Sequence, residues 1–320
     1  MRHDGLRVGP AFALGRRGLA HTENDEPAGA SNSHATAGRA QAAIHVDLDG
    51  ARHIYRAHGW PYDSGDDRLF ESGLRGALDF LAGAECPATF FAIAEDLDDF
   101  RKRALLEGVV DAGHEIASHS VTHRRLTGLD RETKRHEIAE SRRRLASALR
   151  VAVRGFRAPG FGIDHECLEL IQEAGYEYDS SMWDVRHANG RLPGPFQPLP
   201  GEPLVEMPVP AAGPFGWPFH PSYSLAVGDW YFRAGLRAFR RRQTPMVLLF
   251  HLTDFSDPLP RAHARGFPQR LFTLSTLSAE GKRARCRAML DLVRRHFVLA
   301  TTSDLLEAAR AVPSRVASRN

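Results

Sequence analysis

The sequence predicts an α/β fold, a deformed and incompletely closed barrel of about seven parallel strand–helix units in a single domain. From residue 42 onward, short apolar runs alternate with amphipathic stretches about seven times, which is typical of parallel strands joined by helices. The 320 residues are 42% hydrophobic, which is enough for one sizeable core. Polar clusters follow five of the apolar runs, as expected where the carboxyl ends of barrel strands meet.

Each element is predicted from its periodicity or its turn residues. Leu74, Leu78 and Leu81 recur at helical spacing in the first predicted helix. Asp164 is expected to cap a later helix that Gly175 closes. The predicted strands are 42–46, 87–93, the beginning of 114–123, 152–156, 176–181, 203–209, 245–252 and 297–301, and the predicted helices are 67–84, 97–113, 129–149, 164–175, 228–242, 279–295 and 303–311.

Residues 41–313 are predicted to form the barrel domain. Residues 1–40 are predicted to be a disordered N-terminal tail, because small and polar residues dominate there without apolar periodicity, and residues 314–320 a disordered C-terminal tail. The N-terminal stretch lacks the unbroken apolar core of a secretory signal, which favours the cytoplasm. If the substrate is lipid-linked, we expect the protein at the membrane periphery.

Composition argues against several classes of partner. The formal net charge of +3 comes almost wholly from arginine, and no basic patch interleaved with aromatic residues accompanies it, so we expect no nucleic-acid partner. No run of 18 apolar residues occurs, so we expect no transmembrane segment. The three cysteines are far apart in apolar or helical surroundings, which favours buried thiols. The sequence makes no prediction of oligomeric state.

Acidic residues and histidines at two strand ends have the pattern of metal ligands. Asp47 and Asp49 follow the first strand, and His119 and His123 stand four apart after the third. If that segment turns helically, both imidazoles can face one ion. Two imidazoles and one carboxylate form the ligand set of an open catalytic site, and a second carboxylate could act as the base. Alone, the acids also fit a turn and the histidines two surface residues.

Five segments carry a family resemblance: VDLDG (46–50), SHSVTH (118–123), RAPGF (157–161), YDSSMW (178–183) and LLFHLTD (248–254). In this order and at these intervals they resemble the five motif regions of the polysaccharide deacetylase family, also called carbohydrate esterase family four, which includes nodulation-type chitooligosaccharide deacetylases. The resemblance covers residues 42–306. The His-Ser-x-x-His and Arg-x-Pro-Gly elements are the specific ones, and the last two regions are looser.

The resemblance implies roles for individual residues. Asp49, His119 and His123 match the ligands of one divalent metal ion, for which zinc is the first expectation and cobalt or nickel are alternatives. Asp47 matches the catalytic base and His251 the general acid. Leucine separates the two acids here, whereas they are adjacent in the commonest family pattern. Alternation along a strand would point Asp47 and Asp49 to one side and Leu48 into the packing.

The resemblance also implies supporting residues. Arg157 matches the arginine that holds the base carboxylate, a role that suits the bidentate guanidinium. A region around Asp179 normally steadies the acid and this arginine, and Asp184 is an equally placed candidate. Further candidates for supporting the site or contacting substrate are Pro159, Gly160 and Trp217.

The implied function is a metal-dependent hydrolase that removes the N-acetyl group of an amino sugar, which can be free, lipid-linked, nucleotide-linked or part of an oligosaccharide. Metal-bound water would attack the amide, and a backbone N–H after the histidine motif would stabilise the oxyanion. The Asp-x-Asp form is similar to a subgroup acting on unusual sugars or small amides. Two alternatives are an amidohydrolase of the same fold acting on a non-sugar or cyclic amide and an inactive carbohydrate-binding barrel.

Other polar and aromatic residues receive plainer interpretations. His45 alternates with Asp47 and could face the same side, but solvent-facing loop positions are the expectation for His45, His53 and His58. The aromatic residues of the long loop 185–228 could stack on a sugar or close one end of the core. The loop 252–278 could cover the site or carry surface arginines.

Overall fold

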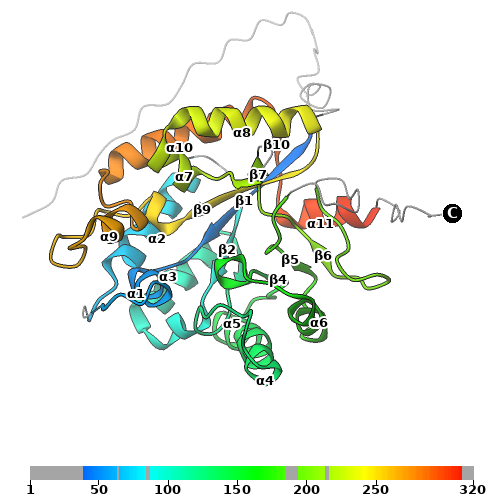
Figure 1. Cartoon of the computed structure of the whole chain (residues 1–320). Coiled ribbons are helices and arrows are strands. Elements are labelled where there is room, and N and C mark those ends of the chain that lie inside the picture. The colour runs from blue at the N-terminus through cyan, green and yellow to red at the C-terminus, as the bar shows by residue number, and fades with distance from the viewer. Residues whose placement is uncertain (1–38, 63–64, 84–86, 185–193, 213–215, 312–320) are drawn as a thin grey trace, which may run out of the picture. The chain divides into compact units, whose positions relative to one another are not determined.

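The computed structural model describes residues 39–62, 65–83, 87–184, 194–212 and 216–311. Among these residues, a parallel sheet curls into an open barrel with helices around it (Figure 1). The predicted tails, 1–40 and 314–320, lie almost wholly outside the described residues.

The main sheet has eight strands in the order β10-β1-β2-β3-β4-β5-β6, and β9 pairs with β1. All of these pairings are parallel, and none joins β6 to β9 in the described part of the chain, so the barrel stays open there. The predicted incompletely closed α/β barrel is thereby confirmed. The strands are β1 (Gln41–Asp47), β2 (Ala88–Ala92), β3 (Glu115–Ser118), β4 (Gly155–Phe156), β5 (Tyr178–Asp179), β6 (Val205–Glu206), β9 (Met246–His251) and β10 (Val298–Leu299), with a separate antiparallel pair β7 (Ala211–Ala212) and β8 (Trp217–Pro218).

The helices fall between the strands, as the alternating pattern predicts. They are α1 (Ala51–Ala57), α2 (Arg68–Ala82), α3 (Phe100–Asp111), α4 (Arg131–Arg135), α5 (Ser141–Leu149), α6 (His165–Glu173), α7 (Pro221–Val227), α8 (Asp229–Arg242), α9 (Phe267–Phe272), α10 (Ala279–Arg294) and α11 (Thr302–Ala311). Short helical turns are η1 (Ala94–Asp98), η2 (His136–Glu140), η3 (Pro159–Phe161) and η4 (Leu252–Asp254). The Asp164 cap of α6 is confirmed, because its carboxylate accepts from the Cys167 N–H at 2.9 Å.

The structure differs from the predicted elements in two ways. The predicted helix 129–149 is interrupted by η2, a π-helical turn between α4 and α5. The short helices α1, α7 and α9 were not predicted, because six or seven residues give too little periodicity to recognise. Both differences bear on the site, since η2 and α7 supply side chains to it.

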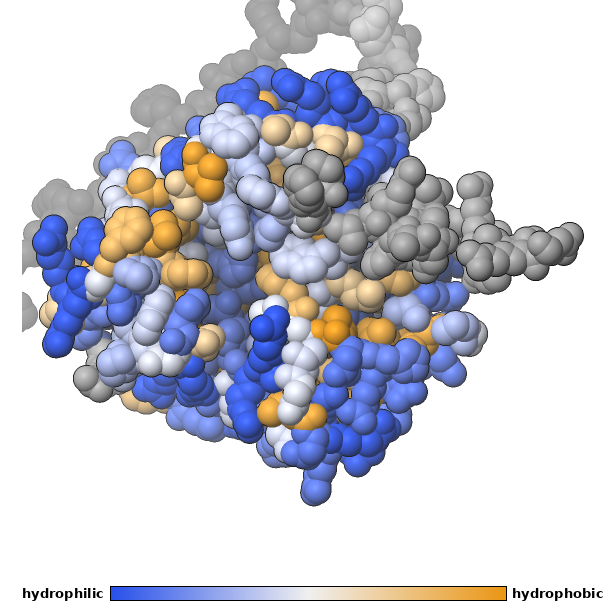
Figure 2. Space-filling model, in the orientation of Figure 1, coloured by the Kyte–Doolittle hydropathy of each residue, from blue (hydrophilic) through white to orange (hydrophobic). Residues whose placement is uncertain are grey.

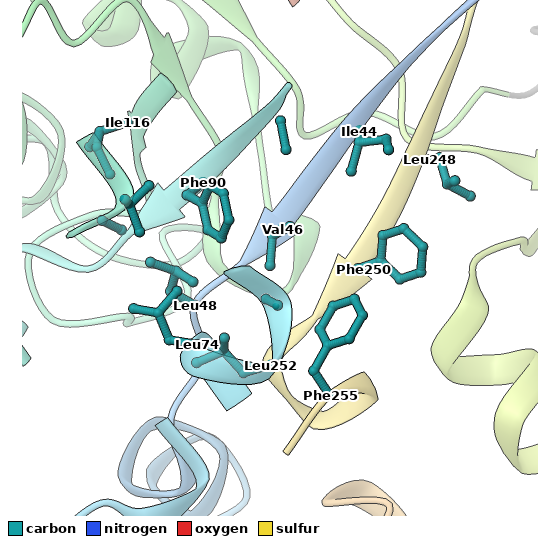
Figure 3. Close-up of a cluster of buried hydrophobic side chains, with 14 of the residues drawn as sticks. Ile44, Val46, Leu48, Leu74, Phe90, Ile116, Leu248, Phe250, Leu252 and Phe255 are labelled. Carbon is teal, nitrogen blue, oxygen red and sulfur yellow. The ribbon is translucent and has the colours of Figure 1, made fainter. Parts of the chain in front are cut away.

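Strand β1 separates two apolar clusters. Ile44, Val46 and Leu48 are buried in the outer cluster beneath the helices, where Leu48 lies beside Leu74 and Leu252 (Figure 3). Ala43 belongs to the inner cluster that the sheet encloses. The prediction that Leu48 enters the packing is therefore confirmed, and the alternation leaves Asp47 facing the other way.

Two glycines of α2 fix the chain just after β9. A Cβ added at Gly73 would lie 2.8 Å from the Leu252 carbonyl oxygen, and one at Gly76 would lie 2.8 Å from that of Phe255. Glycine is therefore what allows α2 to pack directly on η4. This contact holds the segment that follows His251.

The surface differs across the view of Figure 2. The upper edge, where α8 runs, is mainly hydrophilic, whereas hydrophobic residues gather where α9 lies. Phe267, Leu271 and Phe272 of α9 are exposed. None of the described helices has the length and apolar character needed to cross a membrane.

Candidate metal centre and active site

The carboxyl ends of four parallel strands bring the predicted site residues together. Asp47, at the end of β1, is in register with His251 of β9. His119 follows the end of β3, and Arg157 follows β4. The sheet therefore gathers side chains that are up to 204 positions apart in the sequence.

Asp49, His119 and His123 form a cluster with the geometry of a metal site. Their ligand atoms all lie within 4.8 Å of one another. Oδ1 of Asp49 is 3.0 Å from Nε2 of His123 and 3.5 Å from Nε2 of His119. Ligands placed about 2 Å from one ion are separated by roughly these distances. The structure thus brings the three predicted ligands to one point.

The polar atoms of this cluster are poorly satisfied by the protein alone. Oδ1 of Asp49 and both ring nitrogens of His123 are buried without a well-aligned hydrogen bond among the described residues, although Nε2 of His123 lies 3.0 Å from that oxygen. By contrast, Nδ1 of His119 contacts the Arg157 carbonyl at 2.7 Å, which leaves its Nε2 to face Asp49. Burial would raise the pKa of Asp49, but the adjacent His123 and His119 hold it well below its usual value. An ionised carboxylate with unpartnered imidazole nitrogens suits a divalent cation.

A strained loop, and not a helix, presents the two histidines. Ser120 and His123 have φ values of 68° and 57°, a conformation that costs energy for residues other than glycine. The segment 119–123 does not turn helically, and this loop instead brings the two imidazoles to one point. The loop is held by Glu137, whose carboxylate accepts from the Val121 and Thr122 N–H groups at 3.0 and 2.9 Å. Glu137 comes from the π-helical turn η2.

The same contacts exclude several amides as oxyanion donors. The N–H of His119 donates to the Ala92 carbonyl and that of His123 to the Ser120 hydroxyl, while those of Val121 and Thr122 donate to Glu137. These four amides, all inside the histidine motif, therefore already donate within the protein, and the oxyanion donor expected after the motif stays a prediction.

A buried histidine behind the cluster was assigned wrongly from the sequence. His53, expected in a solvent-facing loop, is fully buried on α1, and its ring centroid lies 5.7 Å from that of His123. Its Nε2 contacts Oε1 of Glu95 at 2.8 Å. Arg56 donates to the same oxygen at 2.8 Å and to the Thr122 carbonyl at 2.9 Å. This group therefore also supports the histidine loop, through the Thr122 carbonyl.

Asp47 is held by Arg157, as the resemblance implies. Both side chains are buried, and Nη1 of Arg157 donates to Oδ1 of Asp47 at 2.5 Å. Nε of Arg157 donates to the Ser180 carbonyl at 2.7 Å and Nη2 to the Ser180 hydroxyl at 2.6 Å. The guanidinium also lies over the Phe91 ring, 3.9 Å from its centroid. A charge-assisted pair with this many contacts fixes the carboxylate firmly.

His251 is within reach of Asp47 but has fewer supports. Its Nε2 lies 3.8 Å from Oδ2 of Asp47, and its Nδ1 lies 3.0 Å from the Ser222 hydroxyl. The His251 N–H donates to Oδ2 of Asp254 at 3.0 Å. Ser222 was missed because α7 lies in the long loop 185–228, where no pattern singles out a serine.

Asp179 and Asp184 form hydrogen bonds with groups other than His251. Asp179 accepts from the Ser181 hydroxyl at 2.7 Å, and that hydroxyl accepts from the Ala158 N–H at 2.8 Å. Asp179 is also paired in register with Glu206, and burial raises the pKa of both carboxyls. Asp179 thus supports the backbone beside Arg157. Asp184 accepts from the Gly194 N–H at 3.0 Å, and His251 is held by Ser222 instead.

The remaining candidates occupy separate positions. Pro159 is buried and Gly160 has a φ of 59° within the turn η3 directly after Arg157. Trp217 is exposed on the β7–β8 pair, so it does not close the core. Phe219, from the same loop, does, because it is buried against Phe232 and Phe239. The loop residues 185–193 and 213–215 lie outside the described residues.

One cavity of the described structure adjoins this site without containing it. It has a volume of about 530 Å³, and both acidic and basic side chains line it, among them Glu95, Asp96 and Lys102. Glu95 connects it to His53 and so to the back of the histidine loop.

Sequence comparison relates the chain to deacetylases. A family model for polysaccharide deacetylases matches residues 60–178, which includes both histidines and Arg157. The chain is 34% identical over 135 residues to a chitooligosaccharide deacetylase of Sinorhizobium fredii, covering 42% of this chain and 59% of that protein. It is 26% identical over 145 residues to a peptidoglycan deacetylase of Helicobacter pylori, covering 44% and 48%. The chain thus spans about half the length of these relatives.

Solved structures share the fold over a larger part of the chain. A Mycobacterium smegmatis protein described as a polysaccharide deacetylase matches with a TM-score of 0.64 and 23% identity over 88% of this chain and 95% of its own. Puue allantoinase matches with a TM-score of 0.59 and 18% identity over 89% and 95%. At these identities the likeness is one of fold.

Proposed function

We propose that the chain is a member of the polysaccharide deacetylase family, which the family-model match and the similar deacetylases support, and that it is a metal-dependent hydrolase that removes the N-acetyl group from an amino sugar. The observation that carries the proposal is the placement of three functional groups at one end of the barrel. A metal-ligand cluster, a carboxylate held by arginine and a histidine meet at one end of the barrel, and the last two are 3.8 Å apart. A hydrolytic site needs these parts.

Asp49, His119 and His123 would hold the metal ion. Zinc suits two imidazoles and one carboxylate, and three protein ligands leave a position open for water or substrate. Cobalt and nickel are the alternatives. Once bound, the ion would acidify water and polarise the amide carbonyl.

Asp47 is placed to act as the general base. Arg157 takes Oδ1 of its carboxylate at 2.5 Å, which leaves Oδ2 directed to the side where His251 lies. A carboxylate fixed at one oxygen can accept a proton at the other without reorienting. The buried ion pair thus sets the direction of proton transfer.

His251 is placed to return a proton to the departing amine. Its Nε2 faces Asp47 while Nδ1 is held by Ser222. The products would be acetate and a free amine.

The substrate class follows from the relatives. The two named above act on chitooligosaccharide and peptidoglycan, according to their names, so an N-acetylated sugar is the first expectation. A cyclic amide is the alternative suggested by the shared fold of an allantoinase. We favour the sugar because the sequence matches are to deacetylases.

Acetate release tests the proposal. Zinc-loaded protein is incubated with N-acetylated monosaccharides, nucleotide sugars, lipid-linked sugars and chitooligosaccharides, and free acetate is measured. We expect release from at least one sugar, loss of activity with a chelator, and recovery with zinc or cobalt. Activity that resists the chelator would contradict the metal assignment. Hydrolysis of a cyclic amide alone would favour the alternative.

Two variants assign the proton-transfer roles. Asp47→Ala and His251→Ala are each expected to lose nearly all turnover while retaining bound zinc, measured by metal analysis. Near-normal turnover in either variant would remove that residue from the scheme.

A further inference from the structure

Arg157 has a third polar partner inside the barrel, besides Asp47 and Ser180. Nη2 of Arg157 lies 2.8 Å from Nδ1 of His45, and Nε2 of His45 lies 3.0 Å from Oγ1 of Thr302. His45 and Thr302 are both buried. The first strand and the last helix of the described chain therefore meet behind the base.

The arginine determines which nitrogen of His45 carries the proton. A guanidinium can only donate, so Nδ1 must be the acceptor. Burial, and then the positive charge of Arg157, hold the pKa of His45 well below its usual value. The ring is therefore neutral with its proton on Nε2, from which it donates to Thr302.

The same direction of hydrogen-bond donation follows from the other end of a hydrogen-bond chain, where Glu115 lies. Oγ1 of Thr302 lies 2.6 Å from Oγ1 of Thr89, and Thr89 donates to Oε2 of Glu115 at 2.6 Å. Because an ionised carboxylate only accepts, Thr89 must donate to it and receive from Thr302. Thr302 is then free to accept from His45. The arginine and the carboxylate thus impose one direction on every hydrogen bond between them.

Glu115 is held in place for this role. Burial raises the pKa of Glu115, while hydrogen bonds from Thr89 and Tyr178 and the charge of Arg154 favour its ionised form. The Tyr178 hydroxyl donates to Oε1 at 3.1 Å. Tyr178 reaches it by crossing Gly155, where a Cβ would lie 2.0 Å from Cζ of the tyrosine. A side chain at position 155 would therefore displace this anchor.

We propose that His45 is a positioning residue for the base. The hydrogen-bond chain through Thr302 and Thr89 to Glu115 keeps His45 as the neutral Nε2–H tautomer. In that state His45 fixes the Arg157 guanidinium and thereby the Asp47 carboxylate. The inference deepens the proposed deacetylase function. His45 acts through Arg157 and is not expected to contact substrate. Its loss should therefore lower kcat and leave KM nearly unchanged.

Paired substitutions at His45 separate positioning from packing. His45→Leu removes the acceptor for Arg157 and is expected to lower kcat by about 100-fold, since small misplacements of catalytic groups have effects of this size. His45→Asn keeps an oxygen near the Nδ1 position and should recover a large part of that loss. Leu249→Ala is the matched control, because Leu249 is buried and lies in register with His45. A kcat for His45→Leu equal to that of Leu249→Ala would overturn the proposal.

Thr302 tests the chain beyond His45. Thr302→Val keeps the side-chain shape but removes the hydroxyl and should lower kcat by about threefold to tenfold, whereas Thr302→Ser should restore it. Equal kcat values for the two variants would show that the hydroxyl plays no part.

A spectroscopic measurement separates this inference from the proposed function. Long-range ¹H–¹⁵N spectra of the zinc-loaded, histidine-labelled protein report the tautomer directly, with His45→Asn used to assign the resonance. We expect a neutral Nε2–H ring at pH 7, and an Nδ1–H ring or an imidazolium would overturn the proposal. If no acetate is released from any substrate, the deacetylase proposal fails while this measurement still decides the state of His45.

Discussion

Asp47 and Asp49 are two positions apart in the sequence, yet their surroundings differ in kind. Asp47 is 1% exposed and is paired with Arg157, which has further partners in Ser180 and His45. Asp49 belongs to a loop cluster in which Oδ1 of the aspartate and both nitrogens of His123 are buried without well-aligned hydrogen bonds among the described residues. Asp47 is thus held by protein contacts alone, whereas the cluster around Asp49 leaves buried polar atoms that the proposed metal ion would contact.

Arg157 joins these two regions. Its guanidinium holds Asp47, and its carbonyl accepts from Nδ1 of His119. A shift of this residue would therefore move the base and one metal ligand together. Both regions are thus held by Arg157. They differ in whether the protein supplies hydrogen-bond partners for all of their polar atoms.

The largest expected effect separates the two aspartates by their response to zinc. Asp49→Asn should lose both activity and the rise in melting temperature that zinc produces, because binding to the folded state alone stabilises it by about 2.7 kcal/mol at 100 times Kd. Asp47→Asn should lose about 10²- to 10⁴-fold in kcat, the usual contribution of a general base, and keep the zinc-induced rise. Thermal unfolding with and without zinc measures this. Equal zinc responses in the two variants would contradict the division of roles.

Arg157→Lys tests whether a charge alone can serve the base. Lysine cannot donate to Asp47, Ser180 and His45 together, so we expect kcat to fall about 100-fold. The free energy of unfolding should fall by about 3 kcal/mol, since buried partners are left unpaired. Urea denaturation and steady-state kinetics measure the two effects. A variant with wild-type kcat would show that the geometry of the guanidinium is unimportant.

Ser222→Ala should have a smaller effect, because His251 keeps its backbone hydrogen bond to Asp254. Loss of the contact with Nδ1 is expected to lower kcat by about tenfold, the size of a neutral hydrogen bond. Ser72→Ala removes a partly buried hydroxyl that accepts from the Asp257 N–H, and it serves as a control because this hydroxyl lies on α2 and forms no hydrogen bond with His251 in the described part of the chain. Equal kcat values for the two variants would remove Ser222 from the support of His251.

The smallest effect concerns stability alone. Lys282 lies beneath η4, where its Nζ donates to the Thr253 carbonyl at 2.7 Å, and burial lowers its pKa to about 8. Between this value and about 10.4, the unfolded lysine binds more protons than the folded one, so the free energy of unfolding of the wild type rises with pH. Relative to Lys282→Met, that rise should reach at most about 3 kcal/mol. Chemical denaturation between pH 7 and pH 10 measures it, and a constant difference would contradict the lowered pKa.

The meeting of Asp47 and His251 could be predicted from the local sequence pattern. Asp47 and His251 end short apolar runs, and parallel strands bring such ends together whatever their separation in the chain. The partners of His45 could not be predicted, because Thr302 reaches it only through tertiary packing. Ser222 lies on a helix too short to show a period. Glu137 lies in the predicted helix 129–149, where its sequence surroundings do not distinguish it from a helix-surface residue. The π-helical turn that directs its side chain to the histidine loop leaves no mark in the composition.

The meeting of His45 with Thr302 has a consequence for biosynthesis. The ribosome makes β1 early and α11 some 255 positions later, so the strand that carries the base leaves the ribosome long before its last polar partner exists. Until α11 docks, a histidine in the interior of the sheet has no acceptor for its proton, which disfavours closure of the barrel around it. Assembly of the proposed base is thereby tied to the docking of α11.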